Sequence, residues 1–241
     1  MTAPVIDLNA DVGERPGAEG VAADVQLVAA VSSVNVACGF HAGDAATMRA
    51  ICAEAVLRRK RIGAHVSYLD REGFGRRDIE VEPDELRRQI VQQIAALRIE
   101  AGLEHGRVGY VKPHGALYNR AVVDRVRADA IVAAIASVDR HLSLLAPPDS
   151  ELVRSAEARG IACVTEGFAD RGYRPDGTLV PRGEPGAVLD SEQALAQCVE
   201  LAQSGRFRSL CLHSDTPGAA GLAVAIRDRL IGAGYEVRPF A

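Results

Sequence analysis

The stretch PDELRRQIVQQIAALRIEAGLEHGRVGYVK, residues 83–112, carries the clearest signals of the fold. It opens with Pro83, Asp84 and Glu85, a proline and two acids that favour the first turn of a helix. Apolar side chains then recur at helical spacing, at Leu86, Ile90, Ile94 and Leu97. Gly102 ends this pattern, and the short apolar run 108–112 follows it. The stretch therefore predicts a helix over 83–102 and then a strand.

The same alternation of a short apolar run and a longer amphipathic segment extends along the whole chain. Strands are predicted at residues 5–9, 34–38, 62–66, 108–112, 142–146, 161–165 and 209–213, with a short one near 236–238. Helices are predicted near residues 45–60, 83–102, 124–138, 150–159, 191–204 and 218–232. Near-continuous apolar strands separated by helices are typical of an α/β fold with a parallel sheet covered by helices. Such a sheet either closes into a barrel or stays open and doubly wound, and the spacing of the elements allows both.

Nothing in the composition divides the chain, so we expect a single domain spanning residues 1–241. Its 48% hydrophobic and 25% charged residues are ordinary for a globular protein. A chain of this length buries roughly 70–75% of the surface that it exposes when unfolded, and it needs no disulfide for stability. The segment RGYRPDGTLVPRGEPG, residues 171–186, is long for a connection between a strand and a helix. Long loops of this kind often serve as lids or binding loops.

Charge and cysteine usage argue against several classes of function. A net charge of −4, a pI of about 5.9, 4% aromatic residues and no Trp make a nucleic-acid partner a poor expectation. No apolar run is long enough to cross a membrane, and the opening MTAPVIDLNADVGE does not read as a signal peptide. Five cysteines without CxxC spacing indicate reduced thiols rather than a disulfide framework. We therefore expect a cytoplasmic protein.

Polar residues gather just after the predicted strands. Four of the six histidines lie at such ends, on four different strands: His41, His65, His114 and His213. The other polar residues at these ends are Asp7, Asn9, Asp11, Glu14, Asn35, Asp44, Asp70, Lys112, Tyr118, Asn119, Glu166, Asp170, Arg171, Ser214 and Asp215. In parallel α/β folds the carboxyl ends of the strands form the functional sites. The sequence therefore predicts one shared site to which several strands contribute imidazoles and acids.

These residue types allow two kinds of chemistry. Aspartate and histidine from separate strands can hold a divalent metal that activates water, or they can act as metal-free acids and bases. Asp11 and Glu14 are better catalytic candidates than Asp7, which lies inside an apolar run. Lys112 is a candidate for anion binding or for a shifted pKa. The sequence has no GxSxG nucleophile motif and no P-loop, and Cys38 and Cys211 are expected to be inert core thiols.

Six segments resemble those of the LamB/YcsF family and occur in the same order. They are IDLNADVGE, VNVACGFHAGD, IGAHVSYLDREGFGRR, YVKPHGALYN, EGFADRGYRPDGTLVPR and CLHSDTPGA, which extend the resemblance from about Asp7 to the C-terminal helix. In IGAHVSYLD the proline that is usual after the histidine is missing, and CLHSD has Ser214 where glycine is common. Both differences flank the ionisable residues and leave them in place.

The resemblance implies a 5-oxoprolinase activity, the ATP-dependent opening of the lactam 5-oxo-L-proline (pyroglutamate) to L-glutamate. It implies partner subunits B and C, with ATP as co-substrate and Mg²⁺ or another divalent metal as a cofactor. It also implies a seven-stranded, TIM-like (β/α) barrel of the glycoside hydrolase and deacetylase type. Homo-oligomers are compatible with this expectation.

The resemblance also suggests roles for the strand-end residues. Asp11, Glu14, His41, Lys112 and His114 are the catalytic candidates. Candidates for binding substrate or nucleotide are Asn9, Asn35, Asp44, Arg76, Asn119, Arg171, His213 and Asp215. By analogy with deacetylases, Asp11, His65 and His114 are candidate metal ligands. Two alternatives stay open: a stand-alone metal-dependent amide hydrolase or deacetylase on the same barrel, and a non-catalytic binding subunit.

Overall fold

Seven parallel strands close into a barrel in the computed structural model, which describes residues 2–15, 17–214 and 218–240. The order around the barrel is β2-β3-β4-β5-β6-β7-β1, and β1 pairs again with β2 to close it. The strands are β1 (Val5–Val12), β2 (Ser33–Ala37), β3 (Arg61–Val66), β4 (Val108–Pro113), β5 (Ser143–Ala146), β6 (Cys163–Phe168) and β7 (Ser209–Leu212). A further short strand, β8 (Glu236–Val237), pairs with the start of β1. The closing pair, Asn9↔Ser33 to Val12↔Val36, decides between the barrel and the open sheet.

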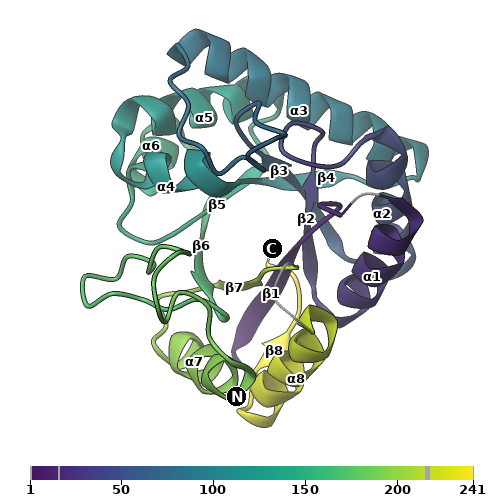
Figure 1. The fold of residues 1–241 in the computed structure, drawn as a ribbon, viewed down its shortest axis with the longest axis vertical. Coiled ribbons are helices and arrows are strands. Elements are labelled where there is room, and N and C mark those ends of the chain that lie inside the picture. Colours follow the sequence, from purple (N-terminus) through teal and green to yellow (C-terminus); the bar gives the residue numbers. More distant parts are fainter. Residues whose placement is uncertain (1, 16, 215–217, 241) are drawn as a thin grey trace.

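Helices surround the barrel on the outside, as Figure 1 shows in a view along the barrel. They are α1 (Gly17–Ala30), α2 (Ala45–Leu57), α3 (Pro83–Leu103), α4 (Gly115–Val123), α5 (Arg125–Val138), α6 (Glu151–Arg159), α7 (Ser191–Gln203) and α8 (Ala219–Gly232). The six predicted helices are confirmed. Helices α1 and α4 were not predicted: α1 is rich in Ala and Gly, and α4 begins directly after the end of β4. Among the described residues, no helix is long and apolar enough to cross a membrane.

Strand β1 shows how the sequence separates the core from the interior of the barrel. Ile6, Leu8, Ala10 and Val12 belong to the main hydrophobic core between strands and helices. The alternating residues, Asp7, Asn9 and Asp11, are equally buried but face the other side of the sheet. Asp11 contacts Lys112 of β4, which lies across the barrel from β1. The barrel interior is therefore a column of polar side chains.

Two strands extend three residues further at their carboxyl ends than predicted. Strand β1 continues to Val12, so Asp11 lies within the strand, and the expectation that it follows the strand is wrong. Strand β6 begins at Cys163 and reaches Phe168, which places Glu166 inside it. Polar residues on an inward face do not end a strand, because their partners lie inside the barrel.

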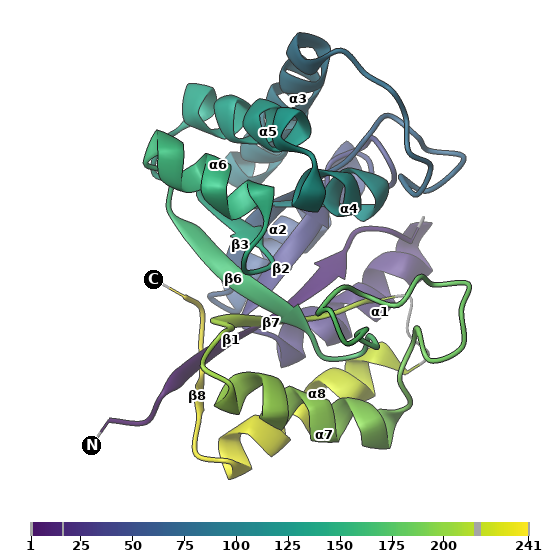
Figure 2. The ribbon, with the colours of Figure 1, turned by 90° about the vertical axis from the view of Figure 1, so that its left-hand side faces the viewer.

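The loop after β6 folds back on itself. Antiparallel bridges join Arg171 to Val188 and Tyr173 to Leu179. Figure 2 shows this segment, drawn in green, extending beyond the carboxyl end of the barrel on the side of α4. The long connection predicted for 171–186 is therefore an ordered loop beside the strand ends.

Candidate active site

The base of the polar column is organised around Asp7. Hydroxyl groups of Ser32 and Ser33 donate to its Oδ1 over 2.6 Å each, and Ser209 donates to its Oδ2. Burial outweighs these hydrogen bonds and raises the pKa of Asp7 to about 6. Asp7 therefore serves the packing of three strands.

Two asparagines form the next layer. Asn35 donates to Asn9 Oδ1 at 2.6 Å and to Asp11 Oδ1 at 2.8 Å, and the Tyr110 hydroxyl donates to Asn35 Oδ1 at 2.7 Å. Asn9 donates in turn to Ser209 Oγ. Both amide hydrogens of Asn35 are used in these contacts. The structure thus places the two predicted binding residues as supports beneath Asp11.

A buried ion-pair group lies above this layer. The Lys112 ammonium is 3.0 Å from Asp11 Oδ1, 2.8 Å from Cys211 Sγ and 3.5 Å from Glu166 Oε2. Burial alone would lower the pKa of Lys112, but Asp11, Cys211 and Glu166 raise it well above its usual value. The pKa of Asp11, raised by burial, is brought well below its usual value by His65 and Lys112. Lys112 is therefore a fixed cation that keeps Asp11 ionised.

Glu14, His41, His65 and His114 form a compact cluster at the carboxyl ends of the strands, which we call the Glu14 cluster. Glu14 Oε1 lies 3.2 Å from His41 Nε2, 3.6 Å from His65 Nε2 and 3.4 Å from His114 Nδ1. His65 Nε2 and His114 Nδ1 are 3.0 Å apart, and the rings of His41 and His114 stack with centroids 3.9 Å apart. All three histidines are buried. Three strand ends thus deliver their imidazoles to one carboxylate.

The outer ring nitrogens of these histidines fix their protonation. His65 Nδ1 is 3.1 Å from the carbonyl oxygen of Lys112, and His114 Nε2 is 2.9 Å from that of Phe74. A carbonyl oxygen only accepts, so these nitrogens carry the hydrogen. His41 Nδ1 faces the Ser67 hydroxyl, which itself donates to the Tyr68 carbonyl, and it therefore also donates.

The inner nitrogens of His41 and His114 consequently present lone pairs toward Glu14. Burial, together with neighbouring imidazoles, lowers the pKa of His41 and of His114 well below the usual value. Both rings are therefore neutral at pH 7. Ligand atoms of the four residues all lie within 4.8 Å of one another. Inward lone pairs held by outer hydrogen bonds are the arrangement of metal-binding histidines, and the cluster fits a divalent metal.

The predicted metal ligands fall into two neighbouring groups. His65 and His114 belong to the Glu14 cluster, whereas Asp11 is paired with Lys112 and groups with Cys211 and His213. His65 Nε2 lies 3.4 Å from Asp11 Oδ2, so the two groups are in contact. Lys112 already neutralises the charge of Asp11 in the group with Cys211 and His213, so this group has less need of a bound cation. The Glu14 cluster is the better place for a cation.

His213 adds a fourth imidazole, which is partly exposed, to the site. Its Nδ1 is 3.0 Å from Asp170 Oδ1, its Nε2 is 3.9 Å from Asp11 Oδ2, and its ring stacks on Phe168. A carboxylate behind one nitrogen orients the ring and leaves the other nitrogen facing the site. This pair has the geometry of a proton carrier.

The remaining predicted residues lie at the rim or away from these groups. Exposed Asp44 caps α2 by accepting from Thr47 N, and Asn119 is exposed on α4. Arg171 is buried and donates to the carbonyls of Val180 and Ala187 within its own loop. Arg76 is exposed over the ring of Phe74, which contacts His41 and His114. Asp215 lies outside the described residues.

Several site residues were not selected from the sequence. Glu166 follows an apolar run but was given no role, and Cys211 was expected to be an inert core thiol, yet both contact Lys112. Burial raises the pKa of Cys211 well above its usual value, so it remains a thiol. The signal that could have found it is the alternation of Ser209, Cys211 and His213, which all face inward with Asp7 and Asp11.

A parallel β/α barrel with carboxylates, imidazoles and a buried ammonium at the carboxyl ends of its strands defines a class of protein built for acid–base or metal-assisted chemistry at that end. The model of the LamB/YcsF family matches residues 6–241, and the chain belongs to this family.

Named relatives match over their full length. The 5-oxoprolinase A subunit of Streptomyces avermitilis is 50% identical over 250 residues, which cover 98% of this chain and 100% of the relative. The protein of the same name from Nocardia farcinica is 47% identical, covering 98% of this chain and 99% of the relative.

Solved structures agree with the barrel. A lactam utilization protein from Thermus thermophilus superposes with a TM-score of 0.89 at 35% identity, covering 98% of this chain and 100% of that one. The catalytic domain of a peptidoglycan N-acetylglucosamine deacetylase from Eubacterium rectale gives a TM-score of 0.55 at 14% identity, covering 99% and 89%. The second likeness is one of fold alone.

Proposed function

We propose that this chain is the A subunit of a 5-oxoprolinase, which with subunits B and C opens 5-oxo-L-proline to L-glutamate at the expense of ATP. The observation that carries the proposal is the full-length match, at 45–50% identity, to proteins of that name. The Glu14 cluster supplies the acid–base groups that such a reaction needs.

A five-membered lactam is a stable amide, so water does not open it at neutral pH without activation of the carbonyl. Transfer of the γ-phosphoryl group of ATP to the amide oxygen, with ADP as the leaving group, makes the carbonyl carbon a better electrophile. Water then adds to this carbon and the C–N bond breaks, which leaves the ring-opened product as an acyl phosphate. A second water hydrolyses this acyl phosphate to glutamate and phosphate. The reaction needs a base for the water and a proton for the ring nitrogen.

Residues of this chain match these two demands. When no metal occupies the cluster, Glu14, surrounded by the neutral rings of His41 and His114, is the candidate base. The His213–Asp170 pair, which is partly exposed, is the candidate donor to the ring nitrogen. Lys112 holds Asp11 ionised, and Asp11 in turn lies against His65. We assign Lys112 a positioning role.

The anionic substrates would be bound by residues at the rim of the site. Arg76, over Phe74, is the candidate cation for the carboxylate of pyroglutamate or for a phosphate. Asn9 and Asn35 act through Asp11, which they support. The positions of Asp44, Asn119 and Arg171 favour roles in the scaffold.

The residues that would hold a metal are Glu14, His41, His65 and His114. A metal bound there would lower the pKa of a water molecule and polarise a carbonyl. Three imidazoles and one carboxylate suit Zn²⁺ better than Mg²⁺, which prefers oxygen ligands. Mg²⁺ is therefore expected to enter with ATP and not at this cluster.

The test mixes the chain with candidate subunits B and C, pyroglutamate, ATP and Mg²⁺, and follows glutamate and ADP. We expect glutamate and ADP to appear together only when pyroglutamate is present. Omission of this chain should abolish both products. Absence of pyroglutamate-dependent ADP release contradicts the proposal. Release of acetate from an N-acetyl sugar by the chain alone, without ATP, would favour the deacetylase alternative.

A further inference from the structure

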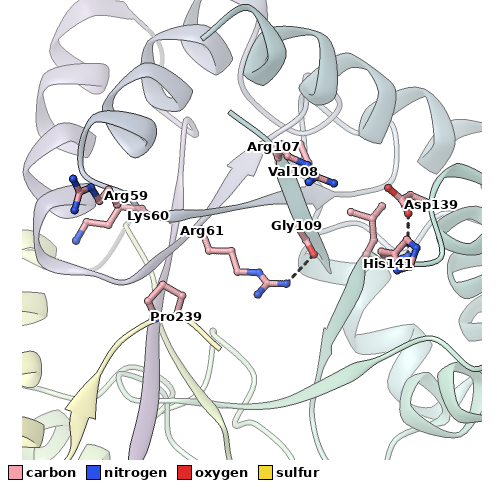
Figure 3. A pocket seen from close by; sticks show the side chains of 10 residues that line it. Arg59, Lys60, Arg61, Arg107, Val108, Gly109, Asp139, His141 and Pro239 are labelled. Carbon is pink, nitrogen blue, oxygen red and sulfur yellow. Dashed lines mark hydrogen bonds between the residues drawn. The ribbon is translucent and has the colours of Figure 1, made fainter. Parts of the chain in front are cut away.

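A pocket lies at the opposite end of the barrel from the Glu14 cluster, among the amino-terminal ends of the strands (Figure 3). Its volume is about 430 Å³, within the range of small-ligand sites. Strand β3 begins here at Arg61 and reaches His65 of the Glu14 cluster four residues later, a separation of roughly 13 Å along a strand. The residues that line the pocket include Arg59, Lys60, Arg61, Arg107, Asp139 and His141. This basic pocket is therefore separate from the candidate active site.

The charges of the basic pocket are unbalanced. Four cations, Arg59, Lys60, Arg61 and Arg107, line the pocket together with a single acid, Asp139. The Lys60 ammonium also lies 3.4 Å from the Ala29 carbonyl oxygen. In the part of the chain that the structure describes, none of these four side chains has an ion pair with a carboxylate within 4 Å. Many arginines elsewhere are paired, for example Arg49 with Glu100 at 2.8 Å and Arg127 with Glu80 at 2.6 Å. In a chain with a net charge of −4, such a concentration of unpaired cations marks a place for an anion.

Arg61 is held in place but incompletely satisfied. Its NH1 donates to the Phe240 carbonyl at 2.6 Å, its NH2 donates to the Gly109 carbonyl at 3.3 Å, and the guanidinium lies 4.5 Å from the centroid of the Phe240 ring. Its Nε is buried and has no hydrogen-bond partner. Figure 3 shows the side chain extending into the space between Gly109 and Pro239. The Arg61 guanidinium is therefore immobilised in the wall of the pocket, where its charge lies beside the space a ligand would occupy.

Favourable interactions with helix dipoles explain the positions of only some of these cations. Arg59 and Lys60 follow the carboxyl end of α2, where cations are favourable. Arg61 lies inside β3, and Arg107 comes three residues after the C-cap of α3 at Glu104, beyond the reach of a terminal turn. Arg59 also has a φ of +56°, a conformation that favours glycine after a helix. A cation is present where the backbone alone would favour glycine.

We propose that the basic pocket binds an oligophosphate anion, either free or as the triphosphate of a nucleotide. The four cations come from two separate segments, residues 59–61 and Arg107, so a ligand with several charges along its length meets more of them than a single carboxylate does. Guanidinium groups match phosphate oxygens in pairs. The proposal concerns a site other than the Glu14 cluster, and it holds or fails independently of the 5-oxoprolinase activity.

The test is calorimetric titration of the purified full chain with inorganic triphosphate, ATP, orthophosphate and L-glutamate, at two salt concentrations. We expect triphosphate to bind at least tenfold more tightly than orthophosphate or glutamate, with an affinity that falls as salt rises. Triphosphate and ATP of equal affinity would indicate recognition of the phosphates alone, and tighter ATP a nucleotide site; both agree with the proposal.

Charge-reversal variants test whether triphosphate binds in the basic pocket. Arg107→Glu and Lys60→Glu should each weaken triphosphate binding at least tenfold, with thermal midpoints close to that of the wild type. The matched control is Arg206→Glu, which reverses an exposed arginine paired with Asp149 elsewhere on the surface and should bind as the wild type does. His114→Ala should also leave binding unchanged. No triphosphate binding by the wild type, equal loss in Arg206→Glu, or loss in His114→Ala would overturn the proposal.

Discussion

The two ends of the barrel carry charge in opposite ways. At the carboxyl end, Lys112 is 2% exposed and its ammonium lies between Asp11 and Glu166. At the amino end, the cations of the basic pocket are at least partly exposed and have no carboxylate partner among the described residues. A buried charge is tolerated only when it is paired, whereas a solvated one needs no partner. The residues at the carboxyl end therefore depend on one another for stability, and those of the basic pocket are available to a ligand.

We expect the largest effect from a variant that removes the buried cation, Lys112. Lys112→Met leaves Asp11 buried without its ion pair, and we expect the free energy of unfolding to fall by about 3–5 kcal/mol. The comparison variant is Lys60→Met in the basic pocket, where we expect a change of no more than about 0.5–1 kcal/mol. Urea unfolding of both variants measures the difference. Equal stabilities would contradict the contrast between the two ends.

A metal titration separates the two groups within the site. Glu14→Gln removes the carboxylate that lies within 3.6 Å of three imidazole nitrogens, and it should lower the affinity for Zn²⁺ by at least the roughly 10–100-fold that loss of an outer partner costs. His213→Ala alters the group around Asp11 and should leave the affinity within about twofold. Titration against a competing chelator, followed by elemental analysis, checks both. A fall in His213→Ala with none in Glu14→Gln would move the metal to Asp11.

Two aspartates on β1, Asp7 and Asp11, differ in the direction of their pKa shifts although both are buried inside the barrel. Burial raises the pKa of Asp7 to about 6, whereas His65 and Lys112 hold that of Asp11 well below its usual value in spite of burial. Between about pH 4 and pH 6 the unfolded chain releases the Asp7 proton before the folded chain does. The contribution of Asp7 to stability is therefore present at low pH and is lost as the pH rises through this window.

Asp7→Asn should remove this dependence. The free energy of unfolding of the variant, relative to the wild type, should rise by roughly 2–3 kcal/mol between pH 4 and pH 7. Urea unfolding at both pH values measures it. Burial also raises the pKa of Asp24 to about 6, but Asp24 is present in both proteins, so its contribution to the pH dependence cancels in the difference. A difference that stays constant with pH would show that Asp7 titrates normally.

The smallest effect concerns Asp44. Asp44→Ala removes the cap of α2 and should cost about 1 kcal/mol of stability while activity is retained. Thermal unfolding and the coupled glutamate assay decide the matter. Lost activity at unchanged stability would restore the binding role that the sequence predicted.

Much of the fold could be predicted because its signals are local. The helix at 83–102 and the apolar runs at 34–38 and 62–66 follow from spacing and end residues, and the structure has elements at each. Closure of the barrel was not readable from periodicity, since the pairing of β1 with β2 joins segments whose spacing is the same in an open sheet. That decision came from the family resemblance and is confirmed.

The site was predictable only as a region. Strand-end position brings His41, His65, His114 and Glu14 together, as the clustering of polar residues suggested. It does not distinguish a side chain that faces the site from one that supports it. Asn35 is committed to Asn9 and Asp11, and Arg171 to its own loop, because each finds partners in segments distant in sequence.

The most direct test of the account is the activity of the reconstituted enzyme with His114→Ala, beside His105→Ala as control. His114 lies 3.4 Å from Glu14, whereas His105 is exposed at the carboxyl end of α3. We predict that His114→Ala lowers pyroglutamate-dependent glutamate formation at least about 100-fold, within the range for loss of an acid–base group, and that His105→Ala leaves it unchanged. Full activity of a folded His114→Ala variant would contradict the assignment of the chemistry to the Glu14 cluster.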